Sequence, residues 1–177
     1  LADRGSREVV VGDTQPDLTP IRSGDDLIAV MKDGAIVRLR TSDVSEVWRA
    51  AATPGVYALA YDGDRVYAGF RVKEVRALDR ATGQTAWSCE CGLDNRVLDA
   101  GPDLLIVAAE EGGLFGLAKT DGSSRWHKTF EDRIDDATIV GTNVIVRFAS
   151  GVVRAFDSAT GEDRWTLDRR LDRGDQL

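Results

Sequence analysis

The four tryptophans of this chain are evenly spaced. They lie at Trp48, Trp87, Trp126 and Trp165, so consecutive tryptophans are 39 residues apart, and the 177-residue sequence contains no other tryptophan. A fixed period of this length is the sequence signature of tandem structural repeats, in which each unit buries its apolar faces against its neighbours. The spacing therefore predicts a repeat architecture of four units.

Each period divides into four short strand-like segments. Runs rich in apolar and β-branched residues are bounded by Gly, Asp and Asn turn signals, and no stretch has the apolar spacing of an amphipathic helix. In the second repeat the expected strands are Val56–Tyr61, Val66–Phe70, Val75–Leu78 and Thr85–Glu90. A four-stranded antiparallel unit of about 40 residues is typical of a β-propeller blade. We therefore predict an all-β protein of four such blades.

The clearest copies of the repeat are residues 77–87 and 155–165, which both read A-x-D-x-x-T-G-x-x-x-W. The Asp carboxylate is expected to accept hydrogen bonds from the turn and from the Thr hydroxyl. The Gly is expected to adopt a positive φ, and the small Ala leaves room for a ring. We interpret the tryptophans as contacts between blades. The predicted structural motif comprises Trp48, Trp87, Trp126, Trp165, Asp79, Asp157, Gly83, Gly122, Gly161, Ala77 and Ala155.

These motifs resemble the repeat of the pyrroloquinoline-quinone-type (PQQ-like) β-propellers, a WD40-like architecture, over residues 10 to 168. The second and fourth repeats match fully, the third keeps Gly122 and Trp126, and the first has Arg40 and Val44 in place of the Asp and the Gly. The superfamily includes quinoprotein dehydrogenases, the propeller lipoprotein of the bacterial outer-membrane barrel-assembly machine, and sensor domains of bacterial kinases. The resemblance is strong for fold and weak for function. It points to the non-catalytic branch, and it alone favours a periplasmic or extracytoplasmic location.

The period also divides the chain. We expect a remnant of a preceding blade or outer strand at 1–9, a degenerate blade 1 at 10–48, blade 2 at 49–87, blade 3 at 88–126, blade 4 at 127–168 and a polar tail at 169–177. Four blades are few for this superfamily, so we favour a partial propeller. Closure by pairing Glu8–Val11 with the last blade, or a dimer of two half-rings, are the alternatives. An open array exposes apolar surface and sheet edges, so self-association is expected.

Net charge and residue types exclude several classes of partner and of chemical site. The net charge of −7 argues against nucleic acid and anionic membrane surfaces, and no apolar run is long enough for a transmembrane segment. His127 is the only histidine, so no His-based metal site or catalytic triad can be assembled. Cys89 and Cys91 form a single C-x-C without a second Cys or His pair at zinc spacing. We expect the two thiols to pack between blades, and a redox or soft-metal site is the alternative. We expect solvated loop charges at Asp135-Asp136 and Glu110-Glu111. We expect no cofactor, because the superfamily's quinone site uses adjacent cysteines, which Glu90 separates here.

These observations predict a non-catalytic scaffold that binds a protein partner or a small ligand through one loop face. That face combines the loops from each outer strand to the next inner strand with the loops from each second strand to the third. Its expected contact residues are Arg71, Lys73, Asp94, Asn95, Arg96, Glu110, Glu111, Asp132 and Arg133. The alternatives are a fragment of a quinone-dependent dehydrogenase and the extracytoplasmic sensor domain of a receptor or kinase.

Overall fold

The computed structural model describes residues 18, 20–51 and 53–168. The expected strand at Glu8–Val11 and the predicted segments 1–9 and 169–177 therefore lie outside the described residues. Within the described part, the strands form four antiparallel four-stranded sheets and no helix occurs. The predicted all-β fold of four four-stranded units is confirmed, and we refer to the four sheets as blades 1 to 4.

The strands of each blade follow one another in chain order. Blade 1 contains β1 (Ile21–Ser23), β2 (Asp26–Val30), β3 (Ile36–Arg40) and β4 (Glu46–Arg49). Blade 2 contains β5 (Val56–Tyr61), β6 (Arg65–Phe70), β7 (Glu74–Asp79) and β8 (Thr85–Glu90). Blade 3 contains β9 (Asn95–Ala100), β10 (Leu104–Ala109), β11 (Gly113–Ala118) and β12 (Ser124–Thr129). Blade 4 contains β13 (Ile134–Val140), β14 (Asn143–Phe148), β15 (Val153–Asp157) and β16 (Asp163–Leu167).

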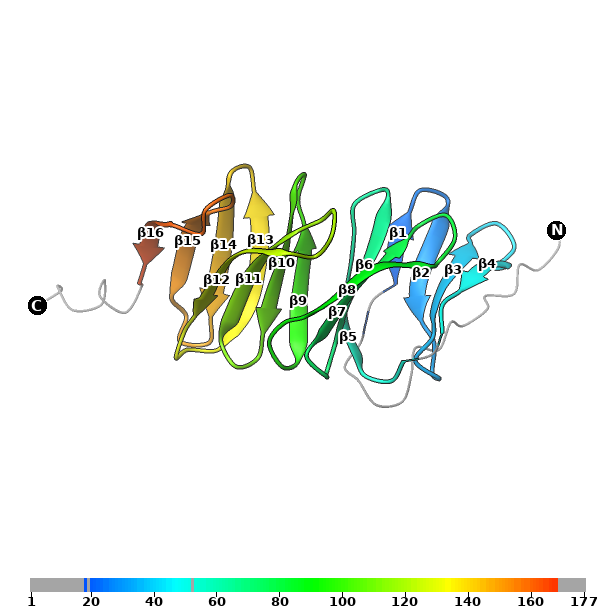
Figure 1. The fold of residues 1–177 in the computed structure, drawn as a ribbon, viewed down its shortest axis with the longest axis horizontal. Coiled ribbons are helices and arrows are strands. Elements are labelled where there is room, and N and C mark those ends of the chain that lie inside the picture. The colour runs from blue at the N-terminus through cyan, green and yellow to red at the C-terminus, as the bar shows by residue number, and fades with distance from the viewer. Residues whose placement is uncertain (1–17, 19, 52, 169–177) are drawn as a thin grey trace, which may run out of the picture.

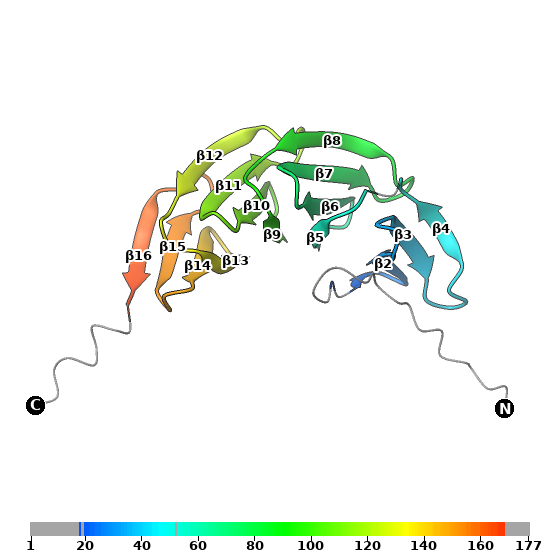
Figure 2. The same cartoon turned by 90° about the horizontal axis from the view of Figure 1, so that it is seen from below.

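The blades stand side by side along an open arc (Figures 1 and 2). Strands β5, β9 and β13 lie on its concave side, whereas β4, β8, β12 and β16 form its convex side (Figure 2). Blades 1 and 4 lie at opposite ends of the arc, so the described sheets do not close into a ring. Each end of the array therefore has one blade face that no other described blade covers.

The repeat extends to the irregularities of the sheets. In every blade the pairing of the third and fourth strands shifts register at the same step, which is Arg38/Leu39, Ala77/Leu78, Gly116/Leu117 and Ala155/Phe156. The turn that follows also recurs. Gly83 N donates to the Asp79 carbonyl oxygen at 2.8 Å, and Val44 N donates to the Arg40 carbonyl oxygen at 3.0 Å. The first repeat thus keeps the turn although it has lost the motif.

The core lies between blades and not within a single one. Ile28 of blade 1 belongs to one buried cluster with Phe70 of blade 2, and Tyr67 of blade 2 belongs to a second with Leu105 of blade 3. A third cluster joins Leu104 of blade 3 to Val144 and Phe156 of blade 4. Because side chains alternate between the two faces of a strand, a blade with neighbours on both sides buries both faces. In agreement, Leu104–Ala109 is buried throughout its length.

Candidate interaction face

A tryptophan links each of the first three blades to the next one. The indole Nε1–H of each ring donates to a backbone carbonyl 32 residues further along the chain. The bonds run from Trp48 to Arg80 at 2.8 Å, from Trp87 to Lys119 at 2.8 Å and from Trp126 to Ser158 at 2.9 Å. Since the rings themselves are at most 9% exposed, each one combines apolar burial with a satisfied donor.

The same rings lie against the motif glycine of the next blade. A Cβ atom added to Gly83 would lie 2.6 Å from Trp48, and one added to Gly122 would lie 2.6 Å from Trp87. At Gly161 it would lie 2.8 Å from Trp126. These glycines also have φ between +72° and +76°. Glycine is therefore required here for two reasons, the backbone conformation and the close approach of the ring.

Trp165 departs from the predicted interblade role. It pairs with Ala155 across β15 and β16, as Trp87 pairs with Ala77 in blade 2, yet its side chain is 48% exposed. The physical reason is that the glycine turn and the carbonyl acceptor come from the following blade. No described blade follows β16, so this ring lies on the uncovered face of blade 4.

The motif aspartates are used within their own turns. Asp79 Oδ1 accepts hydrogen bonds from the backbone N–H and the hydroxyl of Thr82, both at 2.8 Å. Asp157 Oδ1 accepts the same pair from Thr160 at 2.9 and 3.2 Å. These bonds lower the pKa of Asp79, and the pKa of Asp157 falls to about 2, first because of its bond to Arg164.

The loop face predicted from the sequence forms one edge of the sheets. The β6–β7 hairpin carries Arg71 and Lys73, the β8–β9 loop carries Asp94, the β10–β11 hairpin carries Glu110 and Glu111, and the β12–β13 loop carries Asp132 and Arg133. Several of these charges pair with each other. Arg96 Nη2 lies 2.7 Å from Glu110 Oε2, and Arg71 Nε lies 3.9 Å from Asp94 Oδ1.

Asn95 is the member of this predicted set that the structure places elsewhere. It is fully buried, and its Nδ2 donates to the carbonyl oxygen of Glu74 at 3.2 Å. Its amide therefore holds the β6–β7 hairpin and is not offered to a partner. A polar residue beside charged neighbours looked like a surface residue in the sequence, because the sequence does not show that it packs against Gly69 of blade 2.

Two apolar side chains are exposed on the same face. Val72 is 60% exposed on the β6–β7 hairpin, and Leu93 is 44% exposed on the β8–β9 loop. Both line a cavity of about 580 Å³, together with Lys73, Glu74 and Cys89. Sequence reasoning missed this pair, although an apolar residue within a charged loop was the available signal. Exposed apolar side chains that meet around a hollow are typical of interaction sites.

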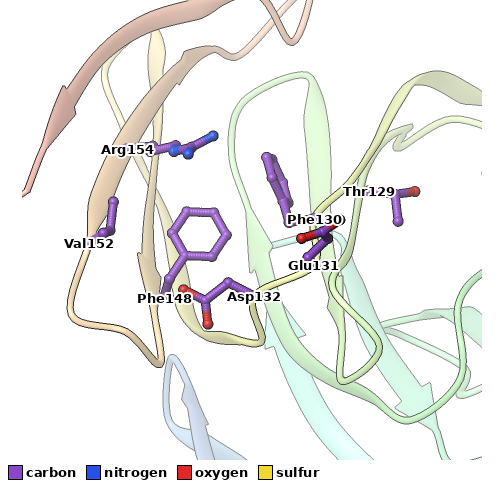
Figure 3. A pocket seen from close by; sticks show the side chains of 7 residues that line it. All are labelled: Thr129, Phe130, Glu131, Asp132, Phe148, Val152 and Arg154. Carbon is purple, nitrogen blue, oxygen red and sulfur yellow. The ribbon is translucent and has the colours of Figure 1, made fainter.

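A second cavity lies between blades 3 and 4 (Figure 3). It has a volume of about 380 Å³ and is lined by Thr129, Phe130, Glu131, Asp132, Phe148, Val152 and Arg154. The rings of Phe130 and Phe148 meet edge to face, with centroids 4.9 Å apart. Arg154 reaches over both rings, with its guanidinium carbon 5.8 and 5.6 Å from the two centroids. Only Asp132 of these residues was singled out from the sequence.

A buried ionic network between blades 2 and 3 also escaped the sequence reading. Lys119 Nζ lies 2.6 Å from Asp62 Oδ2, which also accepts the Tyr67 hydroxyl at 2.7 Å. Burial raises the pKa of Asp62, but the bonds from Lys119, Tyr67 and the backbone outweigh it and leave the pKa below its usual range. Burial and the bond to Asp62 raise the pKa of Tyr67 far above normal. The network stabilises the interface and offers no exposed reactive group.

The remaining chemically notable residues are held structurally. Cys89 Sγ and Cys91 Sγ lie 3.3 Å apart, and Cys91 is buried in the cluster between blades 2 and 3. Their hydrogen bond and burial raise the pKa of Cys91, and the bond lowers the pKa of Cys89. The exposed His127 ring stacks on Phe115 with centroids 4.4 Å apart. These contacts assign none of the three a catalytic partner.

The sequence suggested that the acidic pair Asp135-Asp136 lies in a loop, but the structure places it on a strand. It belongs to β13, where Asp135 pairs with Arg133 at 2.8 Å and with Arg147 at 3.1 Å. Adjacent acidic residues suggested a loop, but here Arg147 of the neighbouring strand β14 and Arg133 of the preceding loop neutralise the Asp135 carboxylate.

The described residues do not match the quinone site of the superfamily's dehydrogenases, which uses adjacent cysteines. Cys89 and Cys91 are separated by Glu90 and their thiols are hydrogen-bonded to each other. The described part of the chain has no group of three or more His, Cys, Asp or Glu side chains placed to hold a metal ion. The described residues also include no helix able to span a membrane.

The recurring turn, the interblade indole and the four-stranded sheets define a PQQ-like β-propeller repeat array. The sequence profile of the family described as outer membrane protein assembly factor BamB matches residues 7–97 and 71–175, so the chain belongs to this family. The resemblance proposed from the tryptophan motif is thereby confirmed. BamB of Burkholderia pseudomallei is 36% identical over 136 residues, which cover 72% of this chain and 35% of that protein.

Solved structures share the fold at lower identity. BamB from Moraxella catarrhalis superposes with a TM-score of 0.75 at 24% identity, covering 89% of this chain and 49% of that chain. The computationally designed Ika8 protein superposes with a TM-score of 0.78 at 16% identity, and the match covers 84% of this chain and 48% of Ika8. The computationally designed Ika4 protein superposes with a TM-score of 0.72 at 16% identity, and the match covers 85% of this chain and 98% of Ika4. The chain thus spans about a third to a half of its BamB relatives.

Proposed function

We propose that this chain is a non-catalytic protein-interaction scaffold that acts in outer membrane protein assembly, on the periplasmic side of the outer membrane. Family membership supports the biological process, because the relatives are described as outer membrane protein assembly factors. In this proposal the segments 10–48, 49–87, 88–126 and 127–168 each supply one blade. The blades act as a rigid support, and the loop face contacts the partner.

The observation that carries the proposal is the exposed apolar pair on that face. Val72 and Leu93 come from adjacent loops of one edge, they are 60% and 44% exposed, and they border the same cavity. Their surroundings are charged, with Lys73 and Glu90 among the lining residues. An apolar centre with a polar rim is the arrangement found in protein–protein interfaces. A protein partner therefore fits this site better than a small polar metabolite.

The test is a co-purification experiment on the affinity-tagged chain, produced in the periplasm of cells that lack their own BamB. The double variant Val72→Asp/Leu93→Asp places two charges at the apolar centre. We expect it to reduce the recovery of outer membrane assembly proteins, identified by mass spectrometry, at least ten-fold relative to the unsubstituted chain. Val140→Asp is the matched control, because Val140 is 58% exposed and ends β13 at the opposite edge.

The control is expected to recover the same proteins as the unsubstituted chain. Equal recovery by the double variant would refute the assignment of this face. Circular dichroism of all three proteins checks that the fold is retained, which is expected because the substituted side chains are exposed and make no core contact.

A further inference from the structure

Arg154 has an equivalent in blade 2, and the two environments differ in one instructive way. Arg76 and Arg154 are 78 residues apart, which is twice the 39-residue period. Both lie on the third strand of a blade, where Arg76 pairs with Ala68 and Ser88 and Arg154 pairs with Val146 and Thr166. Both also reach over a phenylalanine ring of the preceding strand, Phe70 in one case and Phe148 in the other.

In blade 2 the arginine is fully neutralised within the chain. Glu74 Oε1 accepts bonds from Arg76 Nε at 3.0 Å and Nη2 at 2.8 Å, and Thr53 Oγ1 accepts from Nη1 at 3.2 Å. The ion pair is largely buried, with side-chain exposures of 19% for Arg76 and 26% for Glu74. An arginine and a carboxylate in this arrangement stabilise each other because each satisfies the other's charge and hydrogen-bonding groups.

In blade 4 the same arginine has no such partner. The residue equivalent to Glu74 is Val152, and the described residues place no carboxylate within ion-pair distance of Arg154. Its Nε atom is buried and makes no hydrogen bond. A buried donor without an acceptor costs free energy that a bound acceptor would recover. The cavity beside it leaves room for that acceptor, as Figure 3 shows.

We infer that this cavity is a subsite for an acidic side chain of a partner protein, whose carboxylate takes the place on Arg154 that Glu74 takes on Arg76. The inference rests on the proposed function, because it assigns part of the same loop face to recognition. The partly buried ring of Phe130, which Phe148 of the core supports edge to face, packs against the apolar stem of the incoming side chain. The subsite thus recognises a glutamate by its charge at one end and by its methylenes along the Phe130 ring.

Two acidic residues of the cavity lining decide between a protein and a free anion. Glu131 and Asp132 both line the cavity, and Asp132 Oδ2 accepts from Ser150 N at 3.4 Å. Two carboxylates repel a small free anion, whereas they attract a basic residue close to the acidic one in a peptide. The occupant is therefore a peptide segment with lysine or arginine two residues from a glutamate.

Isothermal titration with two acetylated and amidated peptides, KVEVK and KVQVK, tests the subsite on the full chain. We expect KVEVK to bind at least ten-fold more tightly than KVQVK, since only the glutamate supplies the carboxylate. The substitutions Arg154→Gln and Val152→Glu should both abolish this preference. The first removes the guanidinium, and the second supplies an internal carboxylate as Glu74 does in blade 2.

Arg76→Gln is the matched control, because the equivalent arginine is already paired and should leave the ten-fold preference intact. A chain that binds both peptides equally, or an Arg154→Gln variant that keeps the preference, would overturn the inference. The outcome is independent of the co-purification experiment, which depends on Val72 and Leu93 at a different cavity. Failure of the subsite and failure of the proposed function can therefore be told apart.

Discussion

The interface between blades 3 and 4 and the uncovered face of blade 4 contain the same motif in two situations. Trp126 is 9% exposed and donates to Ser158 of the next blade, whereas Trp165 is 48% exposed. Both rings stand over a small residue of their own blade, Gly116 and Ala155. The comparison shows that each interblade interface needs residues from two consecutive repeats. The tryptophan comes from one blade, and its glycine and carbonyl come from the next.

Blade 1 contains the turn that, in blades 2 to 4, lies against the tryptophan of the preceding blade. Val44 occupies the position of the motif glycine and adopts φ +59° in the same turn. The chain's four tryptophans all lie elsewhere, so no indole requires the space that the Val44 side chain fills. A head-to-tail pair of chains would bring Trp165 of one copy onto Val44 of the other. The Val44 side chain fills the space that the motif glycines of blades 2 to 4 leave for an indole ring. This argues against an eight-bladed dimer closed by a contact between Trp165 and Val44.

The largest expected effect separates the two tryptophans. Trp126→Ala removes a buried ring and its hydrogen bond, and we expect it to lower the free energy of unfolding by about 3–5 kcal/mol. Trp165→Ala removes an exposed ring, and the expected change is within about 0.5 kcal/mol. Urea unfolding followed by far-ultraviolet circular dichroism gives both values. Equal losses for the two variants would contradict the comparison.

The next effect concerns the glycine that receives the ring. Gly122→Ala would place a Cβ atom 2.6 Å from Trp87 at a backbone φ of +76°, and we expect a loss of about 2–4 kcal/mol from the combined clash and strain. Gly141→Ala is the control, because Gly141 has φ +60° and no atom within 4 Å of the added Cβ. It should cost only about 1 kcal/mol. If both variants lose the same stability, the ring does not decide the need for glycine.

A smaller effect of opposite sign is expected at blade 1. A β-branched residue with positive φ is strained, so Val44→Gly should raise the free energy of unfolding by about 1 kcal/mol after the loss of side-chain contacts is included. The same urea experiment measures it. A destabilised variant would show that the contacts of Val44 with blade 1 outweigh the backbone strain.

The smallest effect tests whether the turn beside Trp165 forms without a following blade. The pKa of Asp157 is about 2, chiefly because of its bond to Arg164, and this value lies below the value of about 4 for an unfolded Asp. Its contribution is therefore complete above pH 4 and is lost as the pH falls towards 2. Asp157→Asn should flatten the decline of the melting temperature between pH 4 and pH 2. An unchanged slope would mean that the turn is not formed on the uncovered face.

The sequence alone was sufficient to predict the blades, because strand alternation, turn residues and the tryptophan period are local signals that repeat. The exposure of Trp165 was not predictable, since the burial of that ring depends on a following blade. Arg154 was also missed. Its significance appears only when its neighbours are compared with those of Arg76, and the missing carboxylate is a single substitution, Val152 for Glu74, that no local pattern marks. The burial of Asn95 was missed for the same reason, because it depends on contacts with Gly69 and Glu74 of the preceding blade.

The central claim is that an indole of one blade is held by the next blade, and indole hydrogen exchange tests it most directly. In a ¹⁵N-labelled sample each of the four indole Nε1–H groups is expected to give one signal, and the signal lost in Trp165→Phe is that of Trp165. We predict slow exchange into deuterium oxide for Trp48, Trp87 and Trp126, whose N–H groups donate to carbonyls, and rapid exchange for Trp165. Four signals that exchange at the same rate, or a protected Trp165, would contradict the account.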